Sequence, residues 1–160
     1  MAPTSNRPVD WERLITENEN RLYRAALAIL GDAGEAEDAV QETFMKYLEK
    51  RPRLESPEHE RNWLMRVTVN ACKTRLRSPW RRNIPLDEAF TMAAPEERAE
   101  LEELLSLPPK ERLVIHLYYY EGYKTAEIAQ ITGEREGTVR SRMSRARAKL
   151  RTLLADEEEL

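Results

Sequence analysis

The chain has 160 residues and a single cysteine, a length that suits one ordinary domain or two small ones. A disulfide within the chain is impossible, and Cys72, His59 and His116 are scattered, so we expect no metal site and no cofactor. Charged residues make up 34% of the chain and no apolar run approaches the roughly 20 residues that cross a bilayer. The sequence therefore predicts a soluble protein without a signal peptide.

Charge is segregated along the chain, although the net charge is only −3. Residues 61–82 carry seven bases and no acid, and residues 136–154 carry six bases and one acid. Residues 32–60 and 87–104 have net charges of −5 and −6. Two separate basic segments in an acidic chain favour contact with a polyanion at two places, because phosphate binding needs clustered Lys and Arg. The alternative is that both segments are ordinary solvated helix faces.

The first half of the chain predicts three helices. Residues 1–9 contain two prolines and little apolar content, which is typical of a disordered arm, and Asp10 is a suitable helix cap. Apolar residues then recur at helical spacing as far as Gly31. Further helices are expected at about residues 35–49 and 60–77, separated by a turn region between prolines.

The second half predicts a separate helical unit. Prolines interrupt any periodicity after residue 77, so residues 78–94 are expected to be a flexible linker. Helices at about 96–105 and 109–121 precede a helix-turn-helix, and an acidic tail follows at 156–160. Scarce glycine and abundant Leu, Ala, Glu and Arg support an all-α fold with two small helical domains, at residues 10–77 and 95–155.

The predicted helix at residues 35–49 has two different faces. An ordinary core stripe is formed by Ala36, Val40, Phe44, Tyr47 and Leu48. The opposite face places a methionine among acidic and amide groups: Asp38, Gln41, Glu42 and Met45. This pattern suits the docking of a basic partner surface with a small apolar centre. The alternative is a solvated acidic face.

The predicted helix at residues 60–77 carries apolar residues on two faces, so we expect burial on two sides. Trp63 is expected in the core rather than as a stacking platform. The remaining strip consists of Asn62, Arg66, Asn70, Lys73 and Arg77. Cations of this kind bind phosphates, and amides pair with base edges, so the strip predicts a nucleic-acid surface. The alternative is a polar strip that faces solvent.

The helix-turn-helix is indicated by the spacing of Ala129, Gly133 and Val139, which supply a small crossing residue, a turn glycine and an apolar anchor. Val139, Met143 and Ala146 define the buried side of the second helix. Polar and basic residues at the start of that helix predict a DNA recognition surface, formed by Thr138, Arg140, Ser141, Ser144 and Arg145.

The remaining candidate groups favour packing over chemistry. Tyr118, Tyr119 and Tyr120 could form a stacking site, but the apolar residues of their helix favour core and boundary packing. Possible carboxylate pairs lie on polar helix faces without a pocket that would raise a pKa. The sequence therefore predicts that the protein is not an enzyme and has no small-molecule substrate.

Two motifs in order resemble the extracytoplasmic-function group of bacterial RNA polymerase sigma factors. They are GDAGEAEDAVQETFMKYLEK with NWLMRVTVNACKTRLR, and LPPKERLVIHLYYYEGYKTAEIAQITGEREGTVRSRMSRARAKL. The resemblance covers about residues 10–155. It implies a region 2 domain at 10–77 and a region 4 domain at 95–155, joined by a flexible linker.

The resemblance also implies partners for the two surfaces of region 2. The face with Asp38, Gln41, Glu42 and Met45 would bind the clamp helices of the largest subunit of core RNA polymerase. The strip on the next helix would engage the −10 promoter element, with Asn70 beside a flipped base and the cations on the backbone. Leu54 stands where many relatives carry an aromatic wall of the base pocket, which leaves the −10 preference open.

Region 4 would read the −35 element through Thr138, Arg140, Ser141, Ser144 and Arg145, and would touch the polymerase flap. An anti-sigma factor is an expected partner, and the expected location is the cytoplasm, on the nucleoid. We also hypothesise that region 4 covers the basic face of region 2 in the free protein.

Two other functions compete with this interpretation. A helix-turn-helix regulator or adapter would bind DNA without forming holoenzyme. A helical hydrolase or nuclease would need clustered acids or a metal near the basic faces, and residues 61–82 contain no acid.

Overall fold

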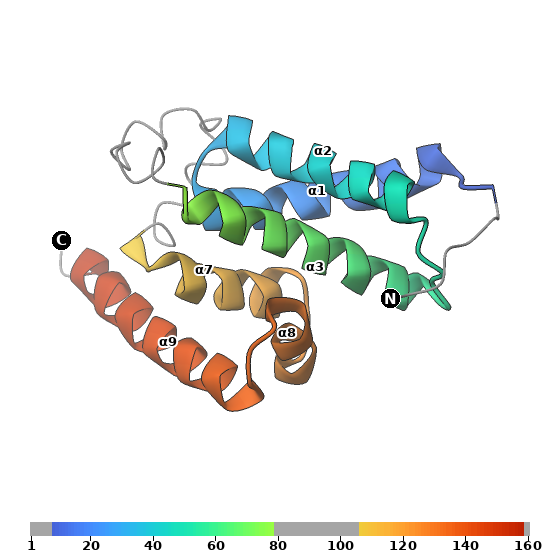
Figure 1. Cartoon of the computed structure of the whole chain (residues 1–160). Coiled ribbons are helices and arrows are strands. Elements are labelled where there is room, and N and C mark those ends of the chain that lie inside the picture. The colour runs from blue at the N-terminus through green and yellow to red at the C-terminus, as the bar shows by residue number, and fades with distance from the viewer. Residues whose placement is uncertain (1–7, 79–105, 159–160) are drawn as a thin grey trace.

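The computed structural model describes residues 8–78 and 106–158, and every regular element in these two ranges is a helix. The first module consists of α1 (Trp11–Leu30), α2 (Ala33–Lys50) and α3 (Pro57–Leu76). The second module consists of α7 (Pro109–Ile115), the π-helical segment η2 (His116–Tyr120), α8 (Thr125–Thr132) and α9 (Glu136–Glu158). Figure 1 shows α1, α2 and α3 side by side, with the second module against α1 and α3.

The predicted all-α class is confirmed. The helix expected at 96–105, nearly all of the linker and most of the N-terminal arm lie outside the described residues. At the other end, α9 continues three residues into the segment that was expected to be a tail.

Local capping explains where the helices of the first module begin and end. The Asp10 side chain accepts a hydrogen bond from the Arg13 amide at 3.1 Å, so α1 begins where the sequence predicts. Gly31 ends α1 in the left-handed conformation, at φ 69°. Ser56 caps α3 and Pro57 occupies its first turn, so this helix begins three residues before its predicted start.

The buried face of α2 differs from the predicted stripe at one position. Leu48 is 56% exposed, so its assignment to the core is wrong. The buried residues of α2 are Ala36, Ala39, Val40, Thr43 and Tyr47. Thr43 enters this face because its hydroxyl lies 2.8 Å from the Thr68 hydroxyl of α3 and donates to the Ala39 carbonyl. A threonine whose hydroxyl has such partners can be buried at a position that an apolar pattern does not assign to the core.

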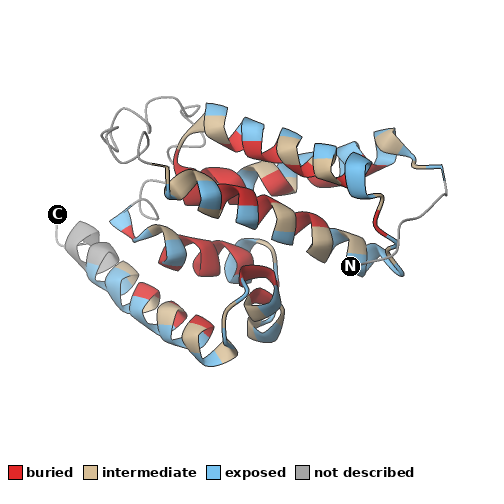
Figure 2. Ribbon diagram, viewed as in Figure 1, coloured by how far each residue is buried: buried red, intermediate tan, exposed pale blue. Residues whose placement is uncertain are grey.

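Burial of α3 on two sides is confirmed. Leu64, Met65 and Val69 are fully buried, and α3 packs against α1 and α2. Figure 2 shows buried positions along α3. The other side of α3 contacts α8 of the second module. Trp63 is half-buried, and its ring packs edge-on against Tyr47 at 5.6 Å between centroids, while Trp11 packs against the same tyrosine at 5.7 Å.

Cys72 lies fully buried in α3, and burial raises the pKa of its thiol to about 12. Because the thiolate is the reactive form, we expect a disulfide reagent at about pH 8 to label the native chain roughly 1000-fold more slowly than the unfolded chain. Absorbance of the released thiol reagent measures both rates, with Cys72→Ser as the blank. Equal rates would show that α3 is not packed as described.

Core and boundary packing is predicted for the three consecutive tyrosines of η2, and the core part of this prediction is wrong because all three are exposed. Tyr118, Tyr119 and Tyr120 are 37%, 55% and 62% exposed. The Glu121 amide donates to the His116 carbonyl, a five-residue step that widens the helix. A prediction based on 3.6 residues per turn misplaces these side chains, because the helix is wider at this point. The Arg147 side chain of α9 covers two of the rings and donates to the Tyr119 hydroxyl at 2.7 Å.

The two modules pack against each other, and we call this packing the closed arrangement. The buried Arg112 guanidinium of α7 donates to the Ile29 carbonyl of α1 at 2.5 Å. Arg21 of α1 donates to the Tyr123 hydroxyl at 3.0 Å. The closed arrangement therefore depends on polar groups that are largely shielded from water, where hydrogen bonds and ion pairs are stronger than at the surface.

Candidate protein and nucleic-acid interfaces

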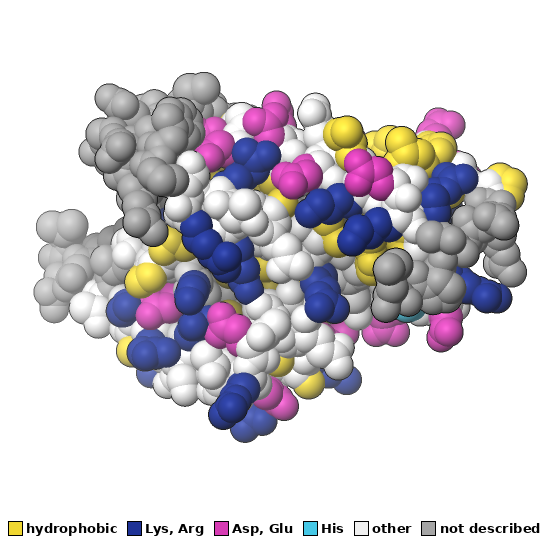
Figure 3. Space-filling model, in the orientation of Figure 1, with side chains coloured by type: hydrophobic (Ala, Val, Ile, Leu, Met, Phe, Trp, Pro, Cys, Tyr) yellow, Lys and Arg dark blue, Asp and Glu magenta, His cyan; other side chains and the backbone are white. Residues whose placement is uncertain are grey.

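The acidic surface of α2 comprises Asp38, Gln41, Glu42 and Met45. Asp38, Gln41 and Met45 are exposed, and Met45 is 60% exposed. Glu42 is half-buried and forms ion pairs with Lys46 at 3.8 Å and with Arg75 at 3.5 Å. Figure 3 shows acidic side chains along α2 and basic side chains below them over α3. The predicted grouping of a methionine with acids on one exposed helix face is confirmed, while its partner stays a prediction.

The basic strip of α3 comprises Asn62, Arg66, Asn70, Lys73 and Arg77. Arg66, Asn70 and Arg77 are exposed, whereas Asn62 and Lys73 are half-buried. The Lys73 amine donates to the carbonyl of Thr132 at the end of α8. The hypothesis that the second module covers the basic face holds only in part, because Lys73 is engaged while Arg66, Asn70 and Arg77 stay exposed.

A shallow cavity between α3 and α8 marks the part of the basic strip that the second module approaches. It is lined from α3 by His59, Asn62, Trp63 and Arg66, and from α8 by Glu127, Gln130 and Ile131. The buried amide oxygen of Asn62 has no hydrogen-bond partner among the described residues. A nucleic acid cannot use the whole strip until α8 moves away.

The pKa of the Lys73 amine is lowered in the closed arrangement. Burial is the largest cause and lowers the pKa of this amine below 10.5. Attraction to Glu134 opposes this, while repulsion from Lys110, Arg77 and Arg142 adds to it. The closed arrangement thus disfavours the charged amine, so its stability rises as the pH increases toward 10.5.

Leu54 lies just before α3. It is half-buried and packs against the core of the first module. Its predicted role beside a captured base stays a prediction.

The recognition surface of α9 follows a turn at Gly133, which has φ 75°. Arg140, Ser141, Ser144 and Arg145 are exposed and Thr138 is half-buried, while Val139, Met143 and Ala146 are buried as predicted.

Within this surface Arg140 is already engaged. It pairs with Glu136 at 2.9 Å, and this contact holds the pKa of the Glu136 carboxyl below its usual range. Binding of a phosphate by Arg140 would have to replace this exposed ion pair, which costs little.

Sequence reasoning missed the residues that join the modules. Arg112 donates a hydrogen bond across the interface to α1. Arg21 of α1 forms an ion pair with Glu121 and donates a hydrogen bond to the Tyr123 hydroxyl. No local signal marks them, because a buried arginine has the same sequence pattern as a surface arginine of an amphipathic helix. In residues 8–78 and 106–158 no group of metal-ligating side chains gathers, and no helix there is long and apolar enough to span a bilayer.

Comparison with known proteins gives two family matches. Sigma-70 region 2 matches residues 14–82, and sigma-70 region 4 matches residues 98–150. The chain is 36% identical to the ECF RNA polymerase sigma factor SigL of Mycobacterium tuberculosis, over 89% of this chain and 88% of that protein. It is 31% identical to the RNA polymerase sigma factor SigV of Bacillus subtilis, over 90% of each chain.

Some relatives are longer than this chain. The chain is 35% identical to a probable RNA polymerase sigma factor, RfaY of Xanthomonas campestris, over 89% of this chain and only 40% of that protein. It spans 62% of the ECF RNA polymerase sigma factor SigE of Mycolicibacterium smegmatis, at 33% identity over 91% of this chain.

A similar solved structure is the sigma factor RpoE of Bartonella quintana in complex with the anti-sigma factor NepR. Its TM-score is 0.73 at 26% identity, over 91% of this chain and 97% of that chain. CnrH in complex with the cytosolic domain of CnrY has a TM-score of 0.64 at 25% identity, over 91% of this chain and 88% of that chain. The chain therefore belongs to the sigma-70 family of RNA polymerase sigma factors. Within that family its relatives and its two regions are those of the extracytoplasmic-function (ECF) group.

Proposed function

We propose that this chain is a sigma factor that binds core RNA polymerase and directs initiation at a restricted set of promoters. Region 2, at residues 10–77, binds the polymerase and melts the −10 element. Region 4, at residues 95–155, reads the −35 element. Residues 78–94 connect the two regions. The observation that carries the proposal is that one chain of this family presents an acidic surface on α2, a basic strip on α3 and a recognition surface on α9. The polymerase performs the chemistry.

The acidic surface of α2 is suited to the clamp helices of the largest polymerase subunit. Exposed Asp38 and Gln41 supply charge and hydrogen bonds, and Met45 supplies an adaptable apolar centre. Charge complementarity of this kind raises the association rate and excludes wrong partners.

The basic strip of α3 is suited to the melted −10 strand. Arg66 and Arg77 contact the backbone phosphates, Lys73 joins them once α8 has moved, and Asn70 pairs with an unstacked base. Region 4 places Arg140, Ser141, Ser144 and Arg145 in the major groove of the −35 duplex and touches the flap.

The closed arrangement makes the free chain a poor DNA-binding protein, because α8 lies over part of the basic strip. Formation of holoenzyme requires the two regions to separate. Two similar structures are complexes, one of them with an anti-sigma factor, which supports an anti-sigma partner for this chain. Polymerase and promoter DNA as partners support a cytoplasmic location, on the nucleoid. A regulator that never forms holoenzyme is not favoured, because the matched relatives are RNA polymerase sigma factors.

Run-off transcription on a library of random promoters tests the proposed function. Purified core polymerase is assayed with and without the chain, and the products are sequenced. We expect start sites that appear only with the chain and that share two motifs at fixed spacing. Binding of the chain to DNA without any new start site would contradict the proposal and would favour a regulator.

A further inference from the structure

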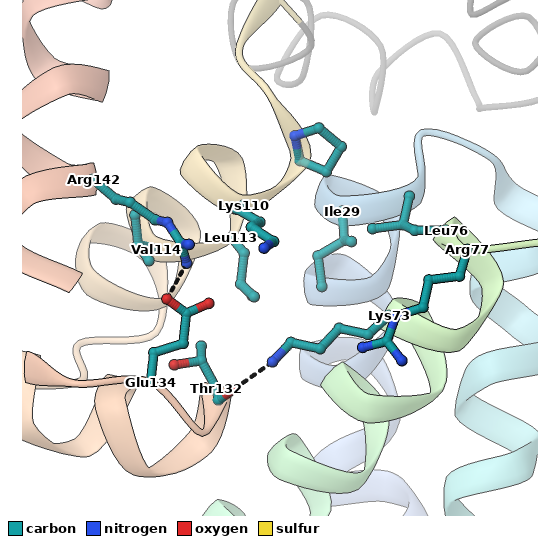
Figure 4. A pocket seen from close by; sticks show the side chains of 11 residues that line it. Ile29, Lys73, Leu76, Arg77, Lys110, Leu113, Val114, Thr132, Glu134 and Arg142 are labelled. Atoms are coloured by element: carbon teal, nitrogen blue, oxygen red, sulfur yellow. Dashed lines mark hydrogen bonds and ion pairs between the residues drawn. The ribbon is translucent and has the colours of Figure 1, made fainter. Parts of the chain in front are cut away.

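A second cavity lies between the modules, where the end of α3 meets α7 and α9 (Figure 4). Its volume is about 180 Å³. Its apolar wall is formed by Ile29, Leu76, Pro109, Leu113 and Val114. These residues come from both modules, so only the closed arrangement forms the cavity.

Cations surround this apolar wall. Lys73, Arg77, Lys110 and Arg142 line the cavity together with a single carboxylate, Glu134, so its lining has a net charge of +3. Glu134 pairs with Arg142, and the Lys73 amine donates to a carbonyl on the rim. Figure 4 shows no hydrogen bond or ion pair from Arg77 or Lys110 to the other residues drawn around the cavity. Two cations therefore face the cavity without a counter-charge among its lining residues.

Three further cations act on Lys73, which agrees with the net positive charge of the lining. Burial is the main cause that lowers the pKa of its amine, Glu134 opposes it, and the nearby cations Lys110, Arg77 and Arg142 each add a smaller lowering. Like charges held this close repel one another, and an anion in the cavity would remove that repulsion.

We propose that this cavity binds a small phosphate monoester that carries an apolar group. Arg77 and Lys110 hold the phosphate, because a doubly charged group matches two free cations and the planar guanidinium donates to two oxygens at once. The apolar group lies against Leu113 and its neighbours. A cavity of roughly 150 Å³ holds one benzene molecule, so a single ring or a chain of about six carbons fits here. The ligand is a regulator and not a substrate.

Binding favours the closed arrangement, because the ligand contacts both modules at once and loses its site when they separate. The ligand also occupies Arg77, a member of the basic strip, and the closed arrangement that it favours keeps the Lys73 amine on the Thr132 carbonyl. It therefore competes with −10 DNA, a consequence that rests on the proposed function, whereas binding itself does not.

Titration calorimetry of the full 160-residue chain tests the proposal, with phenyl phosphate, inorganic phosphate and phenol as probes. We expect phenyl phosphate to bind at least about tenfold more tightly than either part alone. Lys110→Ala should weaken it by about fivefold or more, because Lys110 is exposed and its loss leaves the fold intact. Arg24→Ala removes an exposed cation of α1 that does not line the cavity, and should change nothing.

Three results would each overturn the proposal: no binding of phenyl phosphate at millimolar concentration, equal affinity for phenyl phosphate and inorganic phosphate, or equal affinity in Lys110→Ala. The titration contains neither polymerase nor DNA. A negative result would therefore leave the proposed function standing, and a negative transcription result would leave the ligand site standing.

Discussion

Asp38→Arg is expected to lower the affinity of the chain for core RNA polymerase by about 100-fold. Asp38 is exposed on α2 beside Gln41 and Met45, so the substitution leaves the core untouched. It replaces an attraction to a basic partner surface by a repulsion, and opposed like charges at an interface cost several kcal/mol. Fluorescence anisotropy of the labelled chain against purified core polymerase measures the two dissociation constants.

Glu19→Arg is the matched control for this reversal. It makes the same charge change at an exposed position on α1, outside the acidic surface, and should retain nearly all affinity. If both variants bind equally well, α2 is not the polymerase surface. If both lose affinity equally, the effect is one of net charge and not of a local interface.

Glu121→Arg is expected to open the closed arrangement. The carboxylate lies 3.9 Å from the Arg21 guanidinium and 3.6 Å from His116, and all three side chains are almost fully buried. An arginine in its place sets two guanidinium groups against each other in a poorly solvated contact, which costs several kcal/mol. The repulsion is relieved when the second module separates from α1.

Small-angle scattering and DNA binding measure this opening. A compact chain of this length has a radius of gyration of about 15 Å, and we expect the variant to exceed it by at least about 3 Å. Affinity for single-stranded DNA should rise, because α8 no longer covers the basic strip. Helix content by circular dichroism must stay unchanged, since its loss would indicate unfolding.

Glu37→Arg serves as the control for opening. It places the same charge on the exposed side of α2, which lies away from the second module in Figure 1, and should leave the chain compact. A compact Glu121→Arg variant with unchanged DNA affinity would show that this polar contact does not hold the modules together.

The helices could be predicted because their signals are local. Asp10 and Gly31 bound α1 through contacts within one turn, and the recognition surface of α9 follows from one helical period. Leu48 and the η2 tyrosines could not be placed in this way. Leu48 lies at the edge of the predicted stripe, where the helical period does not decide burial, and the tyrosines lie in a single widened turn.

The chemistry of the candidate surfaces could be predicted and a cover over the basic face could be hypothesised, but the contacts between the modules could not. Charge and periodicity put Asp38 and Met45 on one exposed face, and Asn70 and Arg77 on another. The contact from Lys73 to Thr132 joins positions 59 residues apart, and no periodic pattern reports such a pair. The contacts that form the closed arrangement are therefore known only from the tertiary packing.

Trp11 and Trp63 pack edge-on against Tyr47, so tryptophan fluorescence reports mainly on the first module. Both tryptophans belong to the first module, and the described part of the second module has tyrosines but no tryptophan. Trp80 lies outside the described residues. In a Trp80→Phe background, indole emission follows the first module alone, while far-ultraviolet ellipticity averages over all helices. Melting curves from the two signals would then separate the stabilities of the modules without any attached dye.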